Sequence, residues 1–228
     1  MSHNTNIVRL KAVANALREL NQVVVFVGGA TVSLYANSTV APEARPTDDV
    51  DVIIELASYA DYTKLEERLR QIGFINDITS GVICRYKIQG IMVDIMPTAP
   101  ELLGFSNKWY SEGFQNAINY SLDGDEIIKI FSIPYFIASK LEAFKSRGKG
   151  DYRTSSDFED IVYVFENGLE VKSHLKKANE NIHAYLREEF THLLKDDSFE
   201  EGLFAHLEYY TANEKGMEII RILQELYL

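Results

Sequence analysis

The sequence predicts an α+β fold, with strands and helices alternating in the first part of the chain and helices alone after it. An apolar, β-branched run at residues 23–27 ends in a Gly-Gly pair, and a second apolar run at residues 49–54 carries two aspartates. From residue 132 onward, apolar residues recur at helical spacing. We therefore expect an α/β core over residues 1–131 and a helical domain over residues 132–228 that covers a cleft.

Composition excludes several classes of protein. The chain has 228 residues and is 46% hydrophobic, which suits one or two compact domains. Its net charge of −11 argues against a general nucleic-acid coat or a binder of anionic membranes. There is no run of about 18 apolar residues and no signal-peptide core, so we expect a cytoplasmic protein without a membrane span. Cys84, the single cysteine, lies in an apolar stretch and is expected to be a buried, inert thiol.

The first strand is expected to lie between a helix and a tight turn. Residues 23–27 are β-branched or aromatic, which is typical of a buried strand. Gly28 and Gly29 follow it and allow positive φ and the close approach of a ligand. The helix before the strand is predicted by apolar residues at helical spacing: Ile7, Leu10, Ala14, Leu17 and Leu20.

The Gly28-Gly29 turn suits an anion if residues 30–36 form a helix. The free N–H groups of such a helix point back at the turn, where negative charge is favoured. The hydroxyls of Thr31 and Ser33 could add contacts. The alternative is a plain strand-to-helix turn, which a Gly-Gly pair taken alone favours.

The second apolar run carries two carboxylates on one side. Side chains alternate across a strand, so Asp49 and Asp51 share one face while Val50 and Val52 share the other. Two carboxylates on an apolar strand repel each other and are costly to desolvate. A divalent cation between their oxygens removes that cost, and Mg²⁺ suits such a site. The alternative is a strand end with solvated acids.

A third carboxylate is expected on a neighbouring strand. Residues 81–96 predict a hairpin that turns near Gln89-Gly90. On its return strand, Asp94 is an isolated charge among apolar residues and needs a partner. We favour a metal site shared with the two aspartates of the preceding strand. The alternative is a buried salt bridge, for which Arg85 is the candidate.

Further elements follow from local signals. Residues 58–71 form an amphipathic pattern with Ser58 as its cap and Gly73 just beyond its end. Residues 126–131 predict a strand entered from a turn at Asp123-Gly124. Ser132-Ile133-Pro134 then starts a helix that runs to about residue 147. Later candidate helices are residues 171–194, 199–210 and 214–228.

The start of the helical part concentrates charge. Lys140 lies among apolar residues, where the simplest interpretation is a snorkelling lysine. Asp157 and Asp160 share a helix face, and acids in a first turn capped by Ser155 or Ser156 are ordinary. Five basic residues crowd this region, which indicates either a solvated helix end or a polyphosphate or nucleic-acid backbone site: Lys140, Lys145, Arg147, Lys149 and Arg153.

Taken together, these motifs resemble a known family. Gly28-Gly29, a loop, Arg45-x-Thr47-x-Asp49-Val50-Asp51 and a lone Asp94 resemble the nucleotidyltransferase superfamily of DNA polymerase β-like fold. The set is similar to the branch of abortive-infection, AbiE-type toxins and uncharacterised bacterial nucleotidyltransferase-like proteins. The resemblance covers residues 23–164 and implies a core made of a mixed sheet flanked by helices. The gap between Gly29 and Asp49 is longer than in the compact family pattern, which indicates an inserted loop over residues 36–46.

The resemblance implies roles for individual residues. In that superfamily the Gly-Gly turn holds a triphosphate and three carboxylates hold two Mg²⁺ ions, which here would be Asp49, Asp51 and Asp94. Ser33 is expected to bind the nucleotide as well, because of the hydroxyl contact that it could add at that turn and not because of the resemblance. The stretch IPYFIASKLEAFKSRG resembles the family's lysine helix and implies that Lys140 contacts the triphosphate. Residues 155–161 resemble its S-x-D-x-x-D helix, which places Asp157 at the site, although serine stands where the toxins often have arginine.

The activity implied by the resemblance is Mg²⁺-dependent transfer of a nucleoside monophosphate from an NTP to an acceptor. The toxin-like relatives favour an RNA or protein acceptor and a role in a toxin–antitoxin or phage-defence system, with a cognate antitoxin as partner. One alternative is an antibiotic-modifying nucleotidyltransferase, whose acidic pocket would agree with the net charge of −11. Another is a non-catalytic nucleotide-binding module. The presence of all three carboxylates argues against that alternative.

Overall fold

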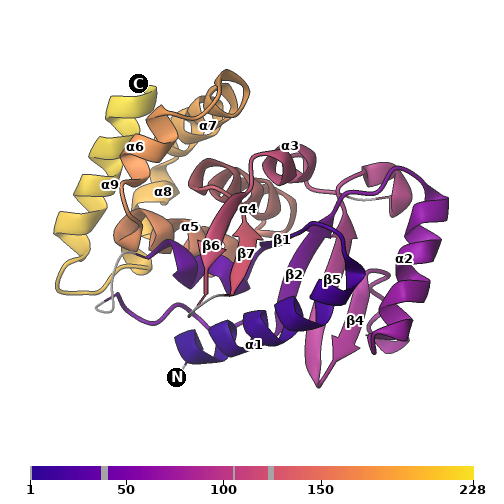
Figure 1. The fold of residues 1–228 in the computed structure, drawn as a ribbon. Helices are drawn as coiled ribbons and strands as arrows, with labels where there is room; N and C mark the ends of the chain where they lie inside the picture. Colours follow the sequence, from indigo (N-terminus) through magenta and orange to yellow (C-terminus); the bar gives the residue numbers. More distant parts are fainter. Residues whose placement is uncertain (1, 37–40, 105, 123–125) are drawn as a thin grey trace. The chain divides into compact units, whose positions relative to one another are not determined.

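The computed structural model describes residues 2–36, 41–104, 106–122 and 126–228 (Figure 1). The chain divides into two compact units. The core unit comprises Met1–Leu34 and Glu43–Ser132, and the helical unit comprises Tyr35–Pro42 and Ile133–Leu228. The helical unit thus includes a short segment from the region between the Gly-Gly turn and the second strand. The turn expected at Asp123-Gly124 and part of the expected loop insertion, residues 37–40, lie outside the described residues.

The described part of the core unit contains one mixed sheet of 7 strands in the order β3-β4-β5-β2-β1-β7-β6. Strand β2 pairs in parallel with β5, and β1 pairs in parallel with β7, whereas the other pairings are antiparallel. The predicted α+β fold with a mixed sheet is therefore confirmed. The strands are β1 Val24–Val27, β2 Asp49–Ile54, β3 Ile75–Asn76, β4 Arg85–Ile88, β5 Ile91–Pro97, β6 Ile118–Ser121 and β7 Ile127–Ile130.

Helices flank this sheet. The first helix, α1, contacts β2 and β5 (Figure 1). Its buried residues are Asn6, Leu10, Val13 and Leu17, whereas two expected core residues, Ile7 and Ala14, are only partly buried. The helices of this unit are α1 Ser2–Leu17, η1 Arg18–Leu20, η2 Gly29–Tyr35 (whose last residue belongs to the helical unit), α2 Tyr59–Gln71, η3 Ile78–Ser80, η4 Pro100–Leu102 and α3 Tyr110–Gln115.

Two local expectations for the core unit are confirmed, and the helix considered for residues 30–36 is present in a particular form. Ser58 caps α2 by accepting from the backbone N–H of Asp61, and the hairpin turns at Gln89-Gly90. The segment after the Gly-Gly turn is a 3₁₀ helix rather than an α-helix. Its Thr31 N–H bonds three residues back to the carbonyl of Gly28, and its β-branched residues, buried on every side, disfavour a regular α-helix.

The helical unit is built around α4. This helix is buried along its first nine residues and contacts α5, α6 and α7. The single helix expected over residues 171–194 is two helices, because Asn179 caps a new one by accepting from the N–H of Ile182. The helices are α4 Ile133–Arg147, α5 Ser156–Asn167, α6 Val171–Lys176, α7 Glu180–Leu193, α8 Asp197–Ala205 and α9 Ala212–Tyr227.

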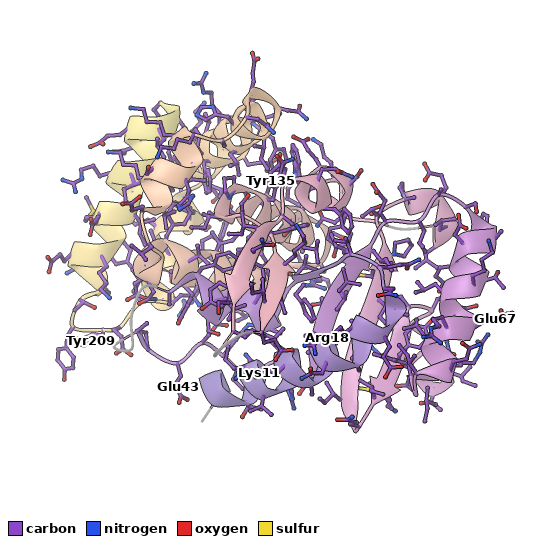
Figure 2. All side chains as sticks on the ribbon, in the orientation of Figure 1. Lys11, Arg18, Glu43, Glu67, Tyr135 and Tyr209 are labelled. Atoms are coloured by element: carbon purple, nitrogen blue, oxygen red, sulfur yellow. The ribbon has the colours of Figure 1, made fainter. Side chains whose placement is uncertain are left out.

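The aromatic side chains of the helical unit include a buried cluster and an exposed pair. Tyr152, Phe158 and Phe199 form part of a buried cluster with ring centroids 5.0–6.1 Å apart. Tyr209 instead projects from the segment between α8 and α9 (Figure 2). Tyr209 and its neighbour Tyr210 are 87% and 94% exposed. Across the described ranges, no helix combines the length and the apolar character that crossing a membrane requires.

Candidate active site

The Gly-Gly turn lies directly against one of the predicted carboxylates. Strand β1 leads into Gly28, which has a φ of +73°. Its neighbour Val27 is the register partner of Asp51 in the antiparallel β1–β2 pair. A Cβ atom on Gly28 would lie 1.9 Å from Oδ2 of Asp51. Glycine is thus required here both for the backbone conformation and for the space that the carboxylate occupies.

We expect Gly28→Ala to destabilise the core unit more than a matched glycine change does. Gly90 has a φ of +81°, but no described heavy atom lies within 4 Å of its Cβ position. Gly90→Ala should therefore cost only backbone strain, about 1–2 kcal/mol, whereas Gly28→Ala adds a clash that costs about 1–3 kcal/mol more. Denaturant unfolding of the two variants measures both values. Equal losses would show that Asp51 moves aside freely.

The loop that carries Arg45 and Thr47 of the family-like motif lies close to Gly29, the second glycine of the turn. A Cβ atom on Gly29 would lie 2.7 Å from Cγ2 of Thr47 and 2.8 Å from Nη2 of Arg45. The backbone of the turn is thus flanked by the Asp51 carboxylate on one residue and the Arg45 guanidinium on the next. A side chain at either glycine would displace a charged group.

Helix α1 holds this loop in place. Asn6 is fully buried, and its Oδ1 accepts from the backbone N–H of Thr47 at 3.4 Å while its Nδ2 donates to the carbonyl of Arg45 at 3.4 Å. Arg9 also donates to the carbonyl of Thr47. Thr47 Oγ1 in turn donates to the carbonyl of Asp49 at 3.0 Å. Sequence reasoning missed Asn6, although an amide four residues before Leu10 on an apolar helix face was the available signal.

The sheet places the three predicted carboxylates on one face. Strands β2 and β5 are parallel neighbours, and Asp51 is the register partner of Asp94. Because alternate residues point to the same side of a strand, Asp49 shares that side. Val50 and Val52 point the other way and are fully buried. We call Asp49, Asp51 and Asp94 the carboxylate face.

Arg85 spans the carboxylate face. Its Nε lies 2.7 Å from Oδ1 of Asp94, and its Nη2 lies 2.7 Å from Oδ2 of Asp94 and 2.8 Å from Oδ2 of Asp49. The salt bridge considered for Asp94 is therefore present, and it includes a second aspartate that the sequence did not connect to Arg85. Hydrogen bonding to Asp94 raises the pKa of Arg85 further above its ordinary value, so this side chain stays charged.

A second charged cluster lies inside the helical unit. Lys140 is 5% exposed, and its Nζ lies 3.1 Å from Oδ1 of Asp157 and 2.6 Å from Oδ2 of Asp160. Arg147 adds a two-pronged pair to Asp157, with Nε to Oδ2 at 2.7 Å and Nη2 to Oδ1 at 2.8 Å. We call these four residues the Lys140 cluster. The snorkelling interpretation of Lys140 is wrong, because its ammonium group points to buried carboxylates rather than to solvent.

Electrostatics within the Lys140 cluster favour the charged form of Asp157. Burial acts to raise the pKa of Asp157, but hydrogen bonds from Arg147 and the charge of Lys140 outweigh it, so the pKa is lowered. The cluster pairs two cations with two carboxylates. Its net charge is therefore zero.

No protein-family model and no curated protein sequence matches the chain. Solved structures do match it. A nucleotidyltransferase-like antigenic protein from Paracoccidioides brasiliensis superposes with a TM-score of 0.54 at 17% identity, covering 90% of this chain and 94% of that chain. The antibiotic-resistance factor ANT(2'')-Ia gives a TM-score of 0.50 at 16% identity, with 85% and 96% covered. The chain has a nucleotidyltransferase fold. Membership of the AbiE-type branch stays a prediction.

The nucleotidyltransferase fold raises the question of a metal ion, and the donor chemistry fits one. Carboxylate oxygens are the ligands that Mg²⁺ prefers, and three carboxylates share one face of the sheet. Because Gly28 has no Cβ atom, the Asp51 carboxylate has room to lie beside the turn. As they stand, however, no three His, Cys, Asp or Glu side chains of the described ranges are grouped to hold an ion together. The oxygens of Asp49 and Asp94 face Arg85 instead.

Two other predicted contributors near this face are buried. The Oγ of Ser33 is buried and has no hydrogen-bond partner among the described residues, so it does not present its hydroxyl to solvent. Thr31 Oγ1 donates to the carbonyl of Gly28 at 2.9 Å.

Burial raises the pKa of the Cys84 thiol to about 12, which keeps it protonated and unsuited to bind metal.

Most of the five basic residues between Lys140 and Arg153 form ion pairs with carboxylates. Besides the Lys140 cluster, Lys145 pairs with Glu142 and Glu189, and Arg153 pairs with Glu201. These pairs favour the solvated helix end over a polyphosphate site as the account of Lys145 and Arg153. A cavity of about 420 Å³ lies along the adjoining segment and includes Arg147 and Asp157.

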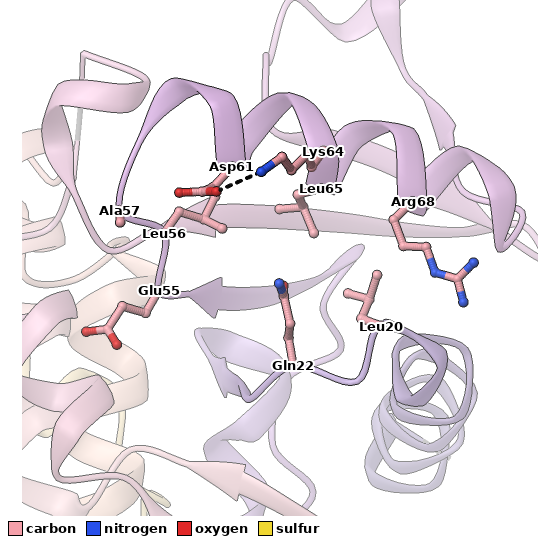
Figure 3. A pocket seen from close by; sticks show the side chains of 9 residues that line it. All are labelled: Leu20, Gln22, Glu55, Leu56, Ala57, Asp61, Lys64, Leu65 and Arg68. Carbon is pink, nitrogen blue, oxygen red and sulfur yellow. Dashed lines mark ion pairs between the residues drawn. The ribbon is translucent and has the colours of Figure 1, made fainter.

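A further cavity, of about 390 Å³, opens in the core unit (Figure 3). It contains Glu55, just after the last residue of β2, so it lies at the opposite end of that strand from Asp49. Asp61 and Lys64 form an ion pair within it at 3.6 Å. None of the predicted site residues lines it, and its full lining is Leu20, Gln22, Glu55, Leu56, Ala57, Asp61, Lys64, Leu65 and Arg68.

Proposed function

We propose that this protein is a metal-dependent nucleotidyltransferase. The observation that carries the proposal is the carboxylate face next to the Gly28-Gly29 turn, in a chain with a nucleotidyltransferase fold. A strand-turn segment that accepts the close approach of a ligand suits a triphosphate, and oxygen ligands on adjacent strands suit Mg²⁺. The positive charge of Arg45 beside Gly29 further favours an anion at the turn.

In the proposed reaction an acceptor oxygen forms a bond to the α-phosphorus of the NTP. The bond from that phosphorus to the oxygen bridging the β-phosphate breaks, and pyrophosphate leaves. Asp49, Asp51 and Asp94 would hold Mg²⁺, which supplies charge neutralisation and lowers the pKa of the acceptor hydroxyl. An Oδ atom of Asp94 receives the proton of the acceptor hydroxyl. Gly28 and Gly29 position the triphosphate through their backbone.

The resemblance to AbiE-type toxins favours RNA or protein as the acceptor. It also suggests growth inhibition controlled by a cognate antitoxin. The same resemblance implies that Lys140 and Asp157 contact the nucleotide, and the hydroxyl of Ser33 is expected to add a contact at the turn. These three roles stay predictions. A second acceptor class, antibiotics, is favoured by the fold match to an antibiotic-resistance factor.

The test combines purified protein, Mg²⁺ and each α-labelled NTP with three separate acceptor pools. Total RNA, total cell protein and a panel of aminoglycosides distinguish the acceptor classes. We expect label in one pool and none when the same preparation carries Asp51→Asn. Bound NTP without label in any pool would support the non-catalytic module. A protein that binds no NTP in the presence of Mg²⁺ would overturn the proposal.

A further inference from the structure

The Arg85 side chain joins three strands. It originates on β4, pairs with Asp94 on β5, and reaches over β5 to Asp49 on β2. One nitrogen, Nη2, is shared between Oδ2 of Asp94 and Oδ2 of Asp49, at 2.7 and 2.8 Å. A salt bridge that served only to neutralise Asp94 would not need the second contact. The guanidinium therefore links two of the three residues of the carboxylate face, Asp49 and Asp94.

The position of this guanidinium conflicts with that of a metal ion. Arg85 donates to both oxygens of Asp94 and to one oxygen of Asp49. A divalent cation held by these carboxylates would need some of the same oxygens, and its charge would repel the guanidinium at such a distance. The two cations exclude each other. The Arg85 side chain is 22% exposed, so it has a route outward to solvent.

We propose that Arg85 is an internal counter-ion that closes the carboxylate face in the metal-free protein and leaves it when a divalent cation binds. This inference rests on the proposed function and adds a regulatory step to it. The apparent affinity of a ligand falls by the fraction of protein in the competent state, so the closed arrangement weakens binding of the metal alone. Arg85 is thus a positioning residue and not a catalytic one.

The same exchange couples the metal to the nucleotide. When Arg85 leaves the carboxylates, its guanidinium carries a full charge that no longer faces two acids. The phosphates of an NTP bound at the adjacent turn offer a replacement partner with fitting geometry. Binding of NTP then favours the open arrangement and raises the affinity for metal, and by thermodynamic linkage metal raises the affinity for NTP by the same factor.

Mn²⁺ binding measured by electron paramagnetic resonance, without turnover and first in the absence of nucleotide, tests the inference. Compared with the wild type, Arg85→Met should bind Mn²⁺ roughly tenfold more tightly. Arg68→Met removes the same charge from an exposed position in the same unit and should leave the affinity unchanged. Adding a non-hydrolysable NTP should tighten Mn²⁺ binding more in the wild type than in Arg85→Met. Arg85→Lys, which keeps the charge but cannot bridge two carboxylates in a plane, should fall between them.

The outcomes separate this inference from the proposed function. If the wild type binds Mn²⁺ and NTP while Arg85→Met and Arg85→Lys bind Mn²⁺ no more tightly, the counter-ion role is overturned and the metal-dependent site stands. If neither the wild type nor any variant binds Mn²⁺, both the metal-dependent function and the counter-ion role of Arg85 are refuted. Thermal melts check that each variant is folded. Loss of tight Mn²⁺ binding in Arg85→Met combined with Asp51→Asn would locate the ion at the carboxylate face.

Discussion

Asp51→Asn is expected to abolish nucleotidyl transfer and leave the fold intact. Asparagine has nearly the same shape as aspartate but lacks the negative charge that holds a metal ion. Metal ions supply several kcal/mol of charge stabilisation in the transition state, so activity should fall roughly a thousandfold or more. Stability should change little, because removing the repulsion between Asp51 and Asp94 offsets the lost attraction between Asp51 and Arg85. Transfer of α-label and denaturant unfolding measure the two effects.

Asp48→Asn is the matched control for this experiment. Asp48 is exposed and directly precedes β2, so its removal changes the net charge by the same amount at nearly the same place. It should retain wild-type activity. Equal losses in Asp48→Asn and Asp51→Asn would point to a general charge effect. Full activity in Asp51→Asn would refute the metal assignment for the carboxylate face.

Local patterns were sufficient for much of the core unit. Alternation along Asp49–Ile54 correctly separated a carboxylate side from a core side. The Gln89-Gly90 turn and the Ser58 cap involve residues close in sequence, where short-range chemistry decides the structure. Strand β6, by contrast, was missed, because its INYS sequence is mostly exposed and is too short for its alternation to stand out.

Contacts between distant residues could not be predicted in the same way. That Arg85 reaches Asp49 follows only from the strand order β4-β5-β2, which no local pattern encodes. The partners of Lys140 lie 17 and 20 residues further along the chain, on another helix. A lysine on an apolar helix face is compatible with solvent, a ligand or a buried acid. The choice among these depends on how α4 packs against α5.

Lys140→Met is expected to destabilise the helical unit strongly. Breaking a buried ion pair by removing one partner costs about 3–5 kcal/mol, because the remaining charge is left buried. Here Asp157 keeps Arg147, but Asp160 loses an ammonium group at 2.6 Å. Lys145→Met is the control, since that lysine is half exposed and its pairs should contribute at most about 1 kcal/mol. Denaturant unfolding measures the difference.

The acid limb of the stability curve offers an independent check of the Lys140 cluster. The pKa of Asp157 is lowered in the folded protein, so its contribution is present above the unfolded value of about 4 and is lost as pH falls through the folded value. Lys140→Met removes one of the charges that lower this pKa. Its stability should therefore depend less on pH below about 4 than that of the wild type.

A double variant decides between a structural and a nucleotide-binding role for Lys140. Lys140→Met with Asp160→Asn removes both members of the shortest pair, and replacing both partners of a buried interaction is far less costly than removing one. The double variant should regain most of the lost stability. If it folds and binds Mg²⁺-NTP as the wild type does, Lys140 serves the helical unit alone. If it folds but binds NTP at least roughly tenfold more weakly, a charge-assisted contact to phosphate is the better account of Lys140, as the resemblance to nucleotidyltransferases implies.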